Sequence, residues 1–237
     1  MNSSSYFSYK DIYTEDGRKV LEVNVLPEKY CNFDCVFCPI GRSQHKTDVQ
    51  RSFPGTDNSI VELENNINVL DPDLIFVNSK GEALLNDRID DIIDLIKAKC
   101  KTVRLFTNGY LLGRSEYMKI ANSCDEVVGE IKGLSEEDFQ KLQRPIEGYT
   151  LAEYISNMAT FRRQYSGKFI FEITIIKGRS DDPGSIDKLK NITREISPDK
   201  IIVAKVNDKR FEKKFSITDE KLEEISKALL NNQHCNC

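Results

Sequence analysis

The stretch YCNFDCVFCPIGR, residues 30–42, places Cys31, Cys35 and Cys38 within eight residues in the spacing C-x3-C-x2-C. Two kinds of metal site are compatible with this spacing. A structural zinc site needs four protein ligands, and the nearby candidate for the fourth is His45. An iron–sulfur cubane held by three cysteines keeps one iron free for an external chelate, such as the amino and carboxylate groups of a small molecule. The spacing alone leaves both alternatives open.

The composition describes a chain without an extended cationic surface. Its 237 residues include 34 Lys plus Arg and 38 Asp plus Glu, a net charge of −4. Proteins that bind nucleic acid normally carry an extended positively charged surface, so a nucleic-acid partner is not expected. The N-terminus shows no apolar signal segment, and no run of about 18 apolar residues predicts a membrane span. Seven cysteines, three of them clustered, indicate metal-bound thiolates in a reducing cytoplasm rather than a disulfide scaffold.

Strand and helix patterns alternate through most of the chain. A β-hairpin is predicted over about 8–27, with its turn at Asp16-Gly17. Its second arm, VLEVNVLP, begins a series whose further strands and helices follow from apolar patterning. The strands are predicted at 73–79, 102–109, 125–133, 168–178 and 200–207, and the helices at 59–70, 88–99, 115–123, 150–166, 185–197 and 217–232.

Six strands, each followed by a helix, predict a parallel sheet with right-handed crossovers. Because a closed barrel has eight such units, the expected fold is α/β, a partial (β/α)6 TIM-like barrel with an N-terminal β-hairpin. No linker or repeat divides the sequence, so we expect a single domain over 1–237. It would contain six βα units over about 20–232 and a short cysteine-containing tail at 233–237. Ligands of such sheets bind at the C-terminal ends of the strands, and the cysteine motif directly follows the first strand.

The cysteine motif, with the aromatic Phe37 directly before its last cysteine, resembles the signature of the radical SAM (S-adenosylmethionine) superfamily. The resemblance covers roughly residues 20–230 and agrees with the number of βα units. It implies that Cys31, Cys35 and Cys38 hold a [4Fe–4S] cluster whose free iron chelates SAM. It also implies an oxidoreductase that takes one electron from an external reductant, such as flavodoxin or ferredoxin. The product is a 5′-deoxyadenosyl radical that abstracts hydrogen from a substrate.

The end of the second strand carries a further match to this family. The segment NSKGEA, residues 78–83, resembles the G-G-E-P motif that holds the methionine end of SAM. Gly81 and Glu82 match the motif, whereas Lys80 and Ala83 replace its first glycine and its proline. A carboxylate at Glu82 is suited to pair with the cationic amino group of the cofactor. A surface turn is the alternative for this segment.

Polar residues also mark the ends of the third, fourth and fifth strands. The triplet TNG, which contains Asn108, resembles the family and makes this residue a candidate cofactor contact. Glu130 and Lys132 lie two residues apart and so share one side of the fourth strand, where similar proteins contact the ribose or the substrate. Glu172 shares a face with Thr174 inside the apolar fifth strand and needs a partner there. Lys132 and Glu172 are therefore candidate catalytic residues; turns and solvated strand edges are the alternatives.

Two stretches resemble one group within the family. The segments VLPEKYCNFDCVFCPIG (25–41) and EEDFQKLQRP (136–145) look like the group related to wyosine base formation, the tRNA guanine-modifying enzymes. The tRNA enzyme carries further N-terminal cysteines for a second cluster, whereas this chain has no cysteine before Cys31. Basic and acidic residues are also interleaved here, as on solvated helix faces. We therefore predict a small-molecule or peptide substrate, with a tRNA substrate as the alternative.

The remaining cysteines and two rival functions complete the predictions. Cys100 and Cys124 fall near element ends and are expected to be small core or boundary residues. His234, Cys235 and Cys237 either bind a second metal or are incidental thiols of a terminal tail. A non-catalytic zinc-binding module would use the three clustered cysteines together with His45. An iron–sulfur electron carrier or partner subunit would hold a cluster without cleaving SAM.

Overall fold

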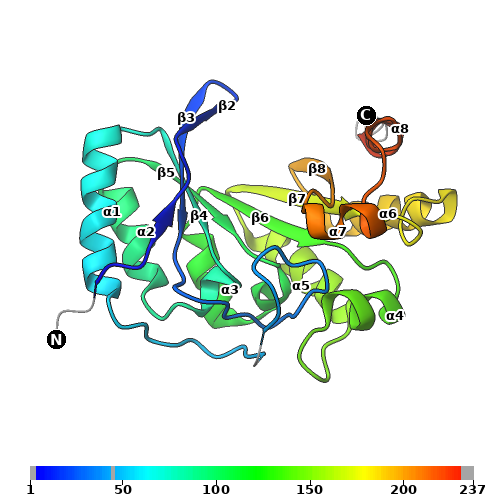
Figure 1. Ribbon diagram of the computed structural model, residues 1–237, viewed down its shortest axis with the longest axis horizontal. Helices are drawn as coiled ribbons and strands as arrows, with labels where there is room; N and C mark the ends of the chain where they lie inside the picture. Colours follow the sequence, from blue (N-terminus) through cyan, green and yellow to red (C-terminus); the bar gives the residue numbers. More distant parts are fainter. Residues whose placement is uncertain (1–3, 44–45, 231–237) are drawn as a thin grey trace.

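The computed structural model describes residues 4–43 and 46–230, and Figure 1 shows their arrangement. The strands of this part are β1 (Ser8–Tyr9), β2 (Tyr13–Glu15), β3 (Arg18–Asn24), β4 (Leu74–Asn78), β5 (Thr102–Phe106), β6 (Glu126–Ile131), β7 (Lys168–Ile175) and β8 (Lys200–Lys205). Its α-helices are α1 (Thr56–Leu70), α2 (Ile89–Ala98), α3 (Ser115–Asn122), α4 (Glu136–Asp138), α5 (Leu151–Gln164), α6 (Pro183–Ile196), α7 (Lys209–Phe215) and α8 (Asp219–Leu230). Short helical turns are η1 (Ala83–Leu85), η2 (Tyr110–Gly113) and η3 (Phe139–Gln143).

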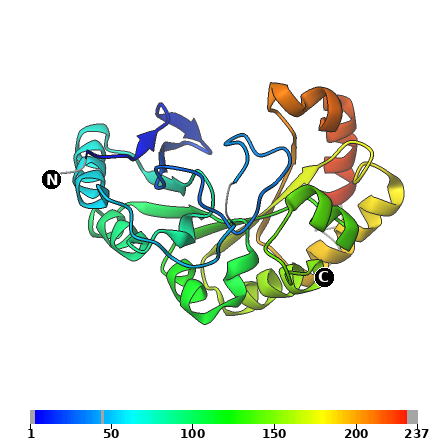
Figure 2. The same ribbon diagram turned by 60° about the horizontal axis from the view of Figure 1, so that its bottom comes forward.

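One curved sheet organises the molecule. Its strand order is β1-β3-β4-β5-β6-β7-β8, and β2 also pairs with β3. The six strands from β3 to β8 are parallel neighbours. The sheet bends into an open half-barrel with helices along its outer side (Figure 2). The predicted partial (β/α)6 barrel is therefore confirmed.

The N-terminal ribbon differs in detail from a simple hairpin. The turn lies at Asp16 and Gly17, which both have positive φ, 49° and 77°. The first arm is split into β1 and β2, and both pair antiparallel with β3. The backbone between them leaves the ladder after Lys10, whose amide N–H still donates to the Glu22 carbonyl at 3.1 Å. This split brings the Lys10 side chain to the edge of the barrel interior.

The outer helices follow the predicted apolar patterns. In α2 the isoleucines at positions 89, 92, 93 and 96 form one buried face, as their spacing predicts. The Thr150 hydroxyl caps α5 by accepting a hydrogen bond from the Glu153 amide at 3.2 Å. One cluster of buried residues, extending from Phe7 to Leu229, packs these helices on the sheet. Within the described residues, no helix has the length and apolar character needed to cross a bilayer.

Two helical segments of the structure are not predicted from the sequence. Residues 136–143 form α4 and η3, and residues 209–215 form α7. Each is only one or two turns long, so the helical period of apolar residues cannot develop. In α7 the apolar residues are only Phe211 and Phe215. Both segments turn out to border the cysteine loop.

Ion pairs join the strands of the open barrel near their N-terminal ends. Arg104 on β5 donates through Nε to Glu126 Oε2 at 2.6 Å and through Nη1 to Glu15 Oε2 at 2.5 Å. Arg18 donates to the other oxygen of Glu126 at 2.8 Å. Arg104 and Glu126 are buried, so their paired charges form the floor of the barrel at the N-terminal ends of the strands.

Candidate active site

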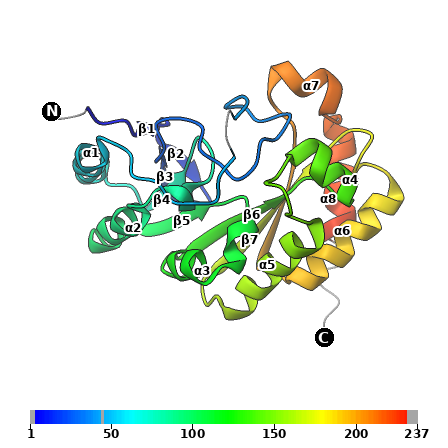
Figure 3. The same cartoon turned by 90° about the horizontal axis from the view of Figure 1, so that it is seen from below.

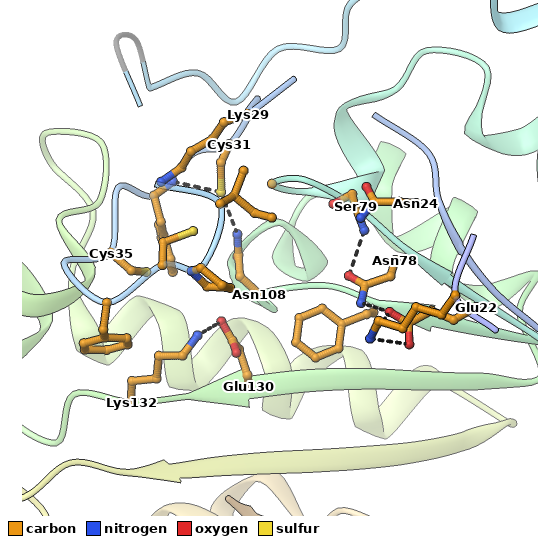
Figure 4. A pocket seen from close by; sticks show the side chains of 18 residues that line it. Glu22, Asn24, Lys29, Cys31, Cys35, Asn78, Ser79, Asn108, Glu130 and Lys132 are labelled. Atoms are coloured by element: carbon orange, nitrogen blue, oxygen red, sulfur yellow. Dashed lines mark hydrogen bonds and ion pairs between the residues drawn. The ribbon is translucent and has the colours of Figure 1, made fainter. Parts of the chain in front are cut away.

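A cavity of about 490 Å³ lies inside the open barrel. Its walls come from the cysteine loop and from strand ends, in agreement with the rule for parallel sheets. Figure 4 shows two groups of polar side chains. One group surrounds Cys31 and Cys35 and includes Asn108, Glu130 and Lys132, and the other lies at the ends of β3 and β4.

The cysteine loop brings all three predicted metal ligands to this cavity. Cys31, Cys35 and Cys38 line it as free thiols, Cys31 being buried and the other two half-buried. Burial raises the pKa of the Cys31 thiol, and it raises the pKa of the Cys35 thiol to about 12. Because metals bind thiolates, loading of this site would release these protons.

Asp34 fixes the shape of the loop between its cysteines. Its carboxylate accepts hydrogen bonds from Arg42 Nε and from the Ser43 amide, both at 2.7 Å. It also accepts a hydrogen bond from Lys29 Nζ at 3.3 Å. These donors precede and follow the cysteines, so one carboxylate ties the two ends of the loop together.

The helical segment 136–143 supports the loop from outside the cavity. The Val36 amide donates to the Leu142 carbonyl at 2.8 Å, and the Asp34 amide donates to the Gln143 carbonyl at 3.1 Å. A β-bridge joins Phe33 to Pro145. The sequence alone does not reveal this contact, because the two segments are about a hundred residues apart. The EEDFQKLQRP stretch thus serves as a support for the cysteine loop.

Gly81 packs directly against the cysteine loop. It forms a parallel β-bridge with Tyr30, and a Cβ atom added to it would lie 2.0 Å from the Tyr30 carbonyl oxygen. The next residue, Glu82, donates its amide N–H to the same carbonyl at 2.9 Å. A glycine is therefore required here for close backbone approach.

Internal hydrogen bonds hold the Glu82 carboxylate. Its side chain is fully buried and does not line the cavity among the described residues. The carboxylate accepts hydrogen bonds from the Asn108 amide at 2.8 Å, the Thr107 hydroxyl at 3.0 Å and the Leu84 amide at 3.2 Å. Burial raises the pKa of Glu82 to about 7, although these donors oppose the rise. Internal donors thus occupy the carboxylate in this structure, and its pairing with a cofactor amino group stays a prediction.

Asn108 connects the third strand end to the cysteine loop. Its Nδ2 donates to Asn32 Oδ1 at 2.6 Å and lies 3.9 Å from Cys31 Sγ, while its Oδ1 accepts from the Tyr110 amide at 3.0 Å. Asn108 is buried and lines the cavity. Hydrogen bonds from Asn108 to Glu82 and to Asn32 thus connect the ends of β4 and β5 to the cysteine loop.

The fourth and fifth strands supply a charged wall. Lys132 forms an ion pair with Glu130, and its Nζ lies 5.9 Å from the centre of the Phe37 ring. Burial alone would lower the pKa of Lys132, but Glu130 and Cys35 outweigh it and the pKa is raised. Glu172 pairs in register with Glu130, and burial together with the Glu130 charge raises the pKa of Glu172 to about 7.

A second space of about 440 Å³ adjoins this wall. Phe37, Glu130 and Lys132 border both spaces, whereas Glu172 and Thr174 line only the second one. The predicted polar face of the fifth strand is thus inside the barrel, beside the cysteine loop.

Sequence reasoning missed a second polar group, at the ends of β3 and β4. Glu22 forms an ion pair with Lys10 at 2.8 Å and accepts Asn78 Nδ2 at 2.9 Å. Asn24 lines the cavity, and its buried Oδ1 has no hydrogen-bond partner among the described residues. The signal was present in VLEVNV, where Glu22 and Asn24 alternate with apolar residues and therefore face one side of the strand.

Other predicted ligands lie apart from this site or outside the described residues. Cys100 is exposed and Cys124 is buried among apolar residues. His45 and the tail with His234 and its two cysteines fall outside the described residues. Among the described residues, no three His, Cys, Asp or Glu side chains group closely enough to hold a single metal ion. A cubane spreads its thiolate ligands over different irons, so three cysteines around one cavity fit it without such convergence.

The sequence model of the radical SAM superfamily matches residues 26–189, which include all three cysteines of the loop. The chain belongs to the radical SAM superfamily. The family implies a [4Fe–4S] cluster and SAM as cofactors, and the three cysteines around one cavity are a donor set that fits such a cluster.

Individual relatives agree with this assignment. The UPF0026 protein MJ1312 of Methanocaldococcus jannaschii is 26% identical over 186 residues, which cover 77% of this chain and 58% of that protein. The chain thus spans less than two thirds of the length of this curated relative. Among solved structures, TYW1 with a bound lysine-pyruvate adduct superposes with a TM-score of 0.66 at 13% identity, covering 90% of this chain and 73% of that one. SuiB of Streptococcus suis bound to S-adenosylmethionine gives 0.64 at 15% identity, covering 89% and 47%. These two likenesses show the fold.

Proposed function

We propose that this protein is a radical SAM enzyme that acts on a small-molecule or peptide substrate. The observation that carries the proposal is the position of Cys31, Cys35 and Cys38 around one end of a cavity whose other walls are polar. When bound, a [4Fe–4S] cluster with SAM on its free iron supplies reductive cleavage of the C5′–S bond and a 5′-deoxyadenosyl radical for hydrogen abstraction. The protein orients the cofactor and encloses the reaction.

The residues beside the cysteines have separate tasks in this proposal. Lys132, with its ammonium held by Glu130, offers a cation for the carboxylate of SAM or for a ribose oxygen. Phe37 offers an apolar face between the two spaces. Glu82 and Asn108 keep the loop and the strand ends in place. Gly81 allows the backbone to approach the loop.

The polar group on β3 and β4 is our candidate substrate side of the cavity. Asn24 and Glu22 lie in a group separate from the cysteines (Figure 4). The unpaired Asn24 oxygen needs a donor, so a substrate with an N–H or O–H group suits this wall. Glu172, in the adjoining space, remains a proposed proton-handling residue because its pKa is raised to about 7 by burial.

A test of the proposal is anaerobic reconstitution followed by reduction in the presence of SAM. We expect a brown protein that forms 5′-deoxyadenosine, detected by chromatography, and a Cys35→Ala variant that forms none. The Cys100→Ala variant is the matched control, because Cys100 is exposed and remote from the loop in sequence. A reconstituted wild type that retains a cluster yet cleaves no SAM with any reductant would support the electron-carrier alternative.

A further inference from the structure

The short helix α7 concentrates positive charge on an acidic protein. It contains Lys209, Arg210, Lys213 and Lys214 against one acidic residue, Glu212, whereas the whole chain has a net charge of −4. All four basic side chains belong to exposed residues. Within the described part of the chain, no ion pair involves the three lysines, and Arg210 pairs with Asp208. The positive charge of the three lysines therefore remains at the surface, where Lys214 Nζ lies 5.0 Å from the centre of the Phe215 ring.

Aromatic and polar contacts fasten α7 to the cysteine loop. The ring of Phe215 packs against Phe37 with 5.7 Å between centroids, and Phe211 joins the same apolar cluster. Arg210 Nη2 donates at 2.7 Å to the carbonyl of Pro39, the residue that directly follows Cys38. Figure 3 shows α7 rising beside this loop. The basic helix is thus a neighbour of the proposed cluster rather than a remote surface element.

An exposed apolar residue lies in the same loop. Ile40 is 43% exposed, which makes it one of the few large apolar side chains at the surface of the described residues. It lies two residues after the half-buried Cys38 and also lines the cavity. We define the α7 patch as Ile40 together with Lys209, Lys213 and Lys214.

We propose that the α7 patch docks an acidic protein that delivers one electron to the cluster. This inference rests on the proposed function. In the step, the donor's reduced flavin or iron–sulfur centre is oxidised by one electron, and the oxidised cluster is reduced by one electron, with no bond made or broken. An exposed apolar side chain in a loop that a basic helix contacts suits a weak, short-lived redox encounter that charge complementarity accelerates. RNA binding would require phosphate contacts with basic residues over a longer surface than α7 provides. The exposed Ile40 makes no phosphate contact.

The test compares two triple charge reversals that keep the cluster loop unchanged. The docking variant is Lys209→Glu/Lys213→Glu/Lys214→Glu. The control is Lys119→Glu/Lys188→Glu/Arg194→Glu, which makes the same charge change at exposed positions on α3 and α6. Stopped-flow absorbance follows cluster reduction by an acidic flavodoxin in its hydroquinone form, and separately by dithionite, at two salt concentrations. Equal far-UV circular dichroism and equal iron content establish that both variants are folded and loaded.

We expect the docking variant to react with flavodoxin at least about tenfold more slowly at low salt, which is the lower end of electrostatic steering effects. The difference should shrink at about 1 M salt, where screening acts over roughly 3 Å. Dithionite should reduce wild type and both variants at similar rates. Equal slowing in the two variants, or none in the docking variant, overturns the proposal. Loss of bulk tRNA binding by the docking variant with an unchanged flavodoxin rate also overturns it. A wild type without any cluster would instead overturn the proposed function.

Discussion

Replacement of Glu82 separates a structural role of this carboxylate from direct contact with SAM. In Glu82→Ala, three buried donors lose their acceptor: the Asn108 amide, the Thr107 hydroxyl and the Leu84 amide. Each unsatisfied buried donor costs roughly 1–3 kcal/mol. Because neighbouring losses are not additive, we expect a total of about 3–5 kcal/mol in the free energy of unfolding. That is a large share of the roughly 5–15 kcal/mol that stabilises an ordinary domain.

The isosteric Glu82→Gln variant gives a graded comparison. If its amide oxygen takes the place of the oxygen that accepts from Asn108 and Thr107, its NH2 group meets the Leu84 N–H, a donor against a donor. One unmet donor predicts a smaller loss of about 1–3 kcal/mol. The control is Glu147→Ala at an exposed position, where we expect a change within about 0.5 kcal/mol.

The assay is urea unfolding of the iron-free protein, followed by circular dichroism, with SAM affinity measured on the reconstituted protein. The iron-free form is used because its stability does not depend on cofactor binding. Our reasoning predicts the order of stability wild type, then Gln, then Ala. It would be refuted if Glu82→Ala were as stable as wild type while the loaded protein lost SAM affinity tenfold or more, because that result assigns the carboxylate directly to the cofactor.

Three further predictions concern the loop contact, the charged wall and the barrel floor. Gly81→Ala should lower the iron bound after reconstitution severalfold, because its Cβ would lie 2.0 Å from the Tyr30 oxygen, whereas Gly184→Ala, with its nearest contact at 3.2 Å, should bind iron normally. Lys132→Met should retain its iron and lose roughly tenfold or more in SAM affinity by calorimetry, as expected for one charge-assisted contact; unchanged affinity would remove Lys132 from the site. Glu126→Gln should destabilise the protein by about 3–5 kcal/mol at pH 7 in urea unfolding, because it breaks a buried ion pair. Burial would raise the pKa of Glu126, but Arg18 and Arg104 lower it below 4.5. The stability that the Glu126 carboxylate contributes is therefore present above pH 4.5 and is lost as the pH falls through the folded-state pKa. An equal destabilisation by Glu126→Gln at pH 3 and pH 7 would contradict this role of the ion pair.

The sequence predicts the barrel well because its strands and longer helices have strong periods. The four isoleucines of α2 determine its buried face, and the cysteine spacing identifies the loop at the rim. Short helical segments such as α7 and residues 136–143 lack a full apolar period, so periodicity does not predict them. Their importance comes from contacts with a loop about a hundred residues or more away.

The sequence indicates which strand ends carry the candidate site residues, but it does not show which groups these residues contact. The sequence places Gly81 and Glu82 at the end of the second predicted strand. It could not show that the Asn108 amide and the Thr107 hydroxyl, at another strand end, donate to the Glu82 carboxylate. Glu22 and Asn24 were missed because their segment reads as an apolar hairpin arm. Which polar residues share a cavity depends on strand register, and the register follows from the folded sheet.

The most direct test of the central claim is electron paramagnetic resonance of the anaerobically purified, reduced protein with and without SAM, together with iron, sulfide and zinc analysis. The account predicts about four irons and four sulfides per chain, as in a cubane cluster. It also predicts a reduced-cluster signal that changes when SAM is added, because SAM binds the iron without a cysteine ligand. Loss of the signal in the Cys38→Ala variant would locate the cluster at the loop. A colourless protein with about one zinc per chain and no such signal would contradict the account.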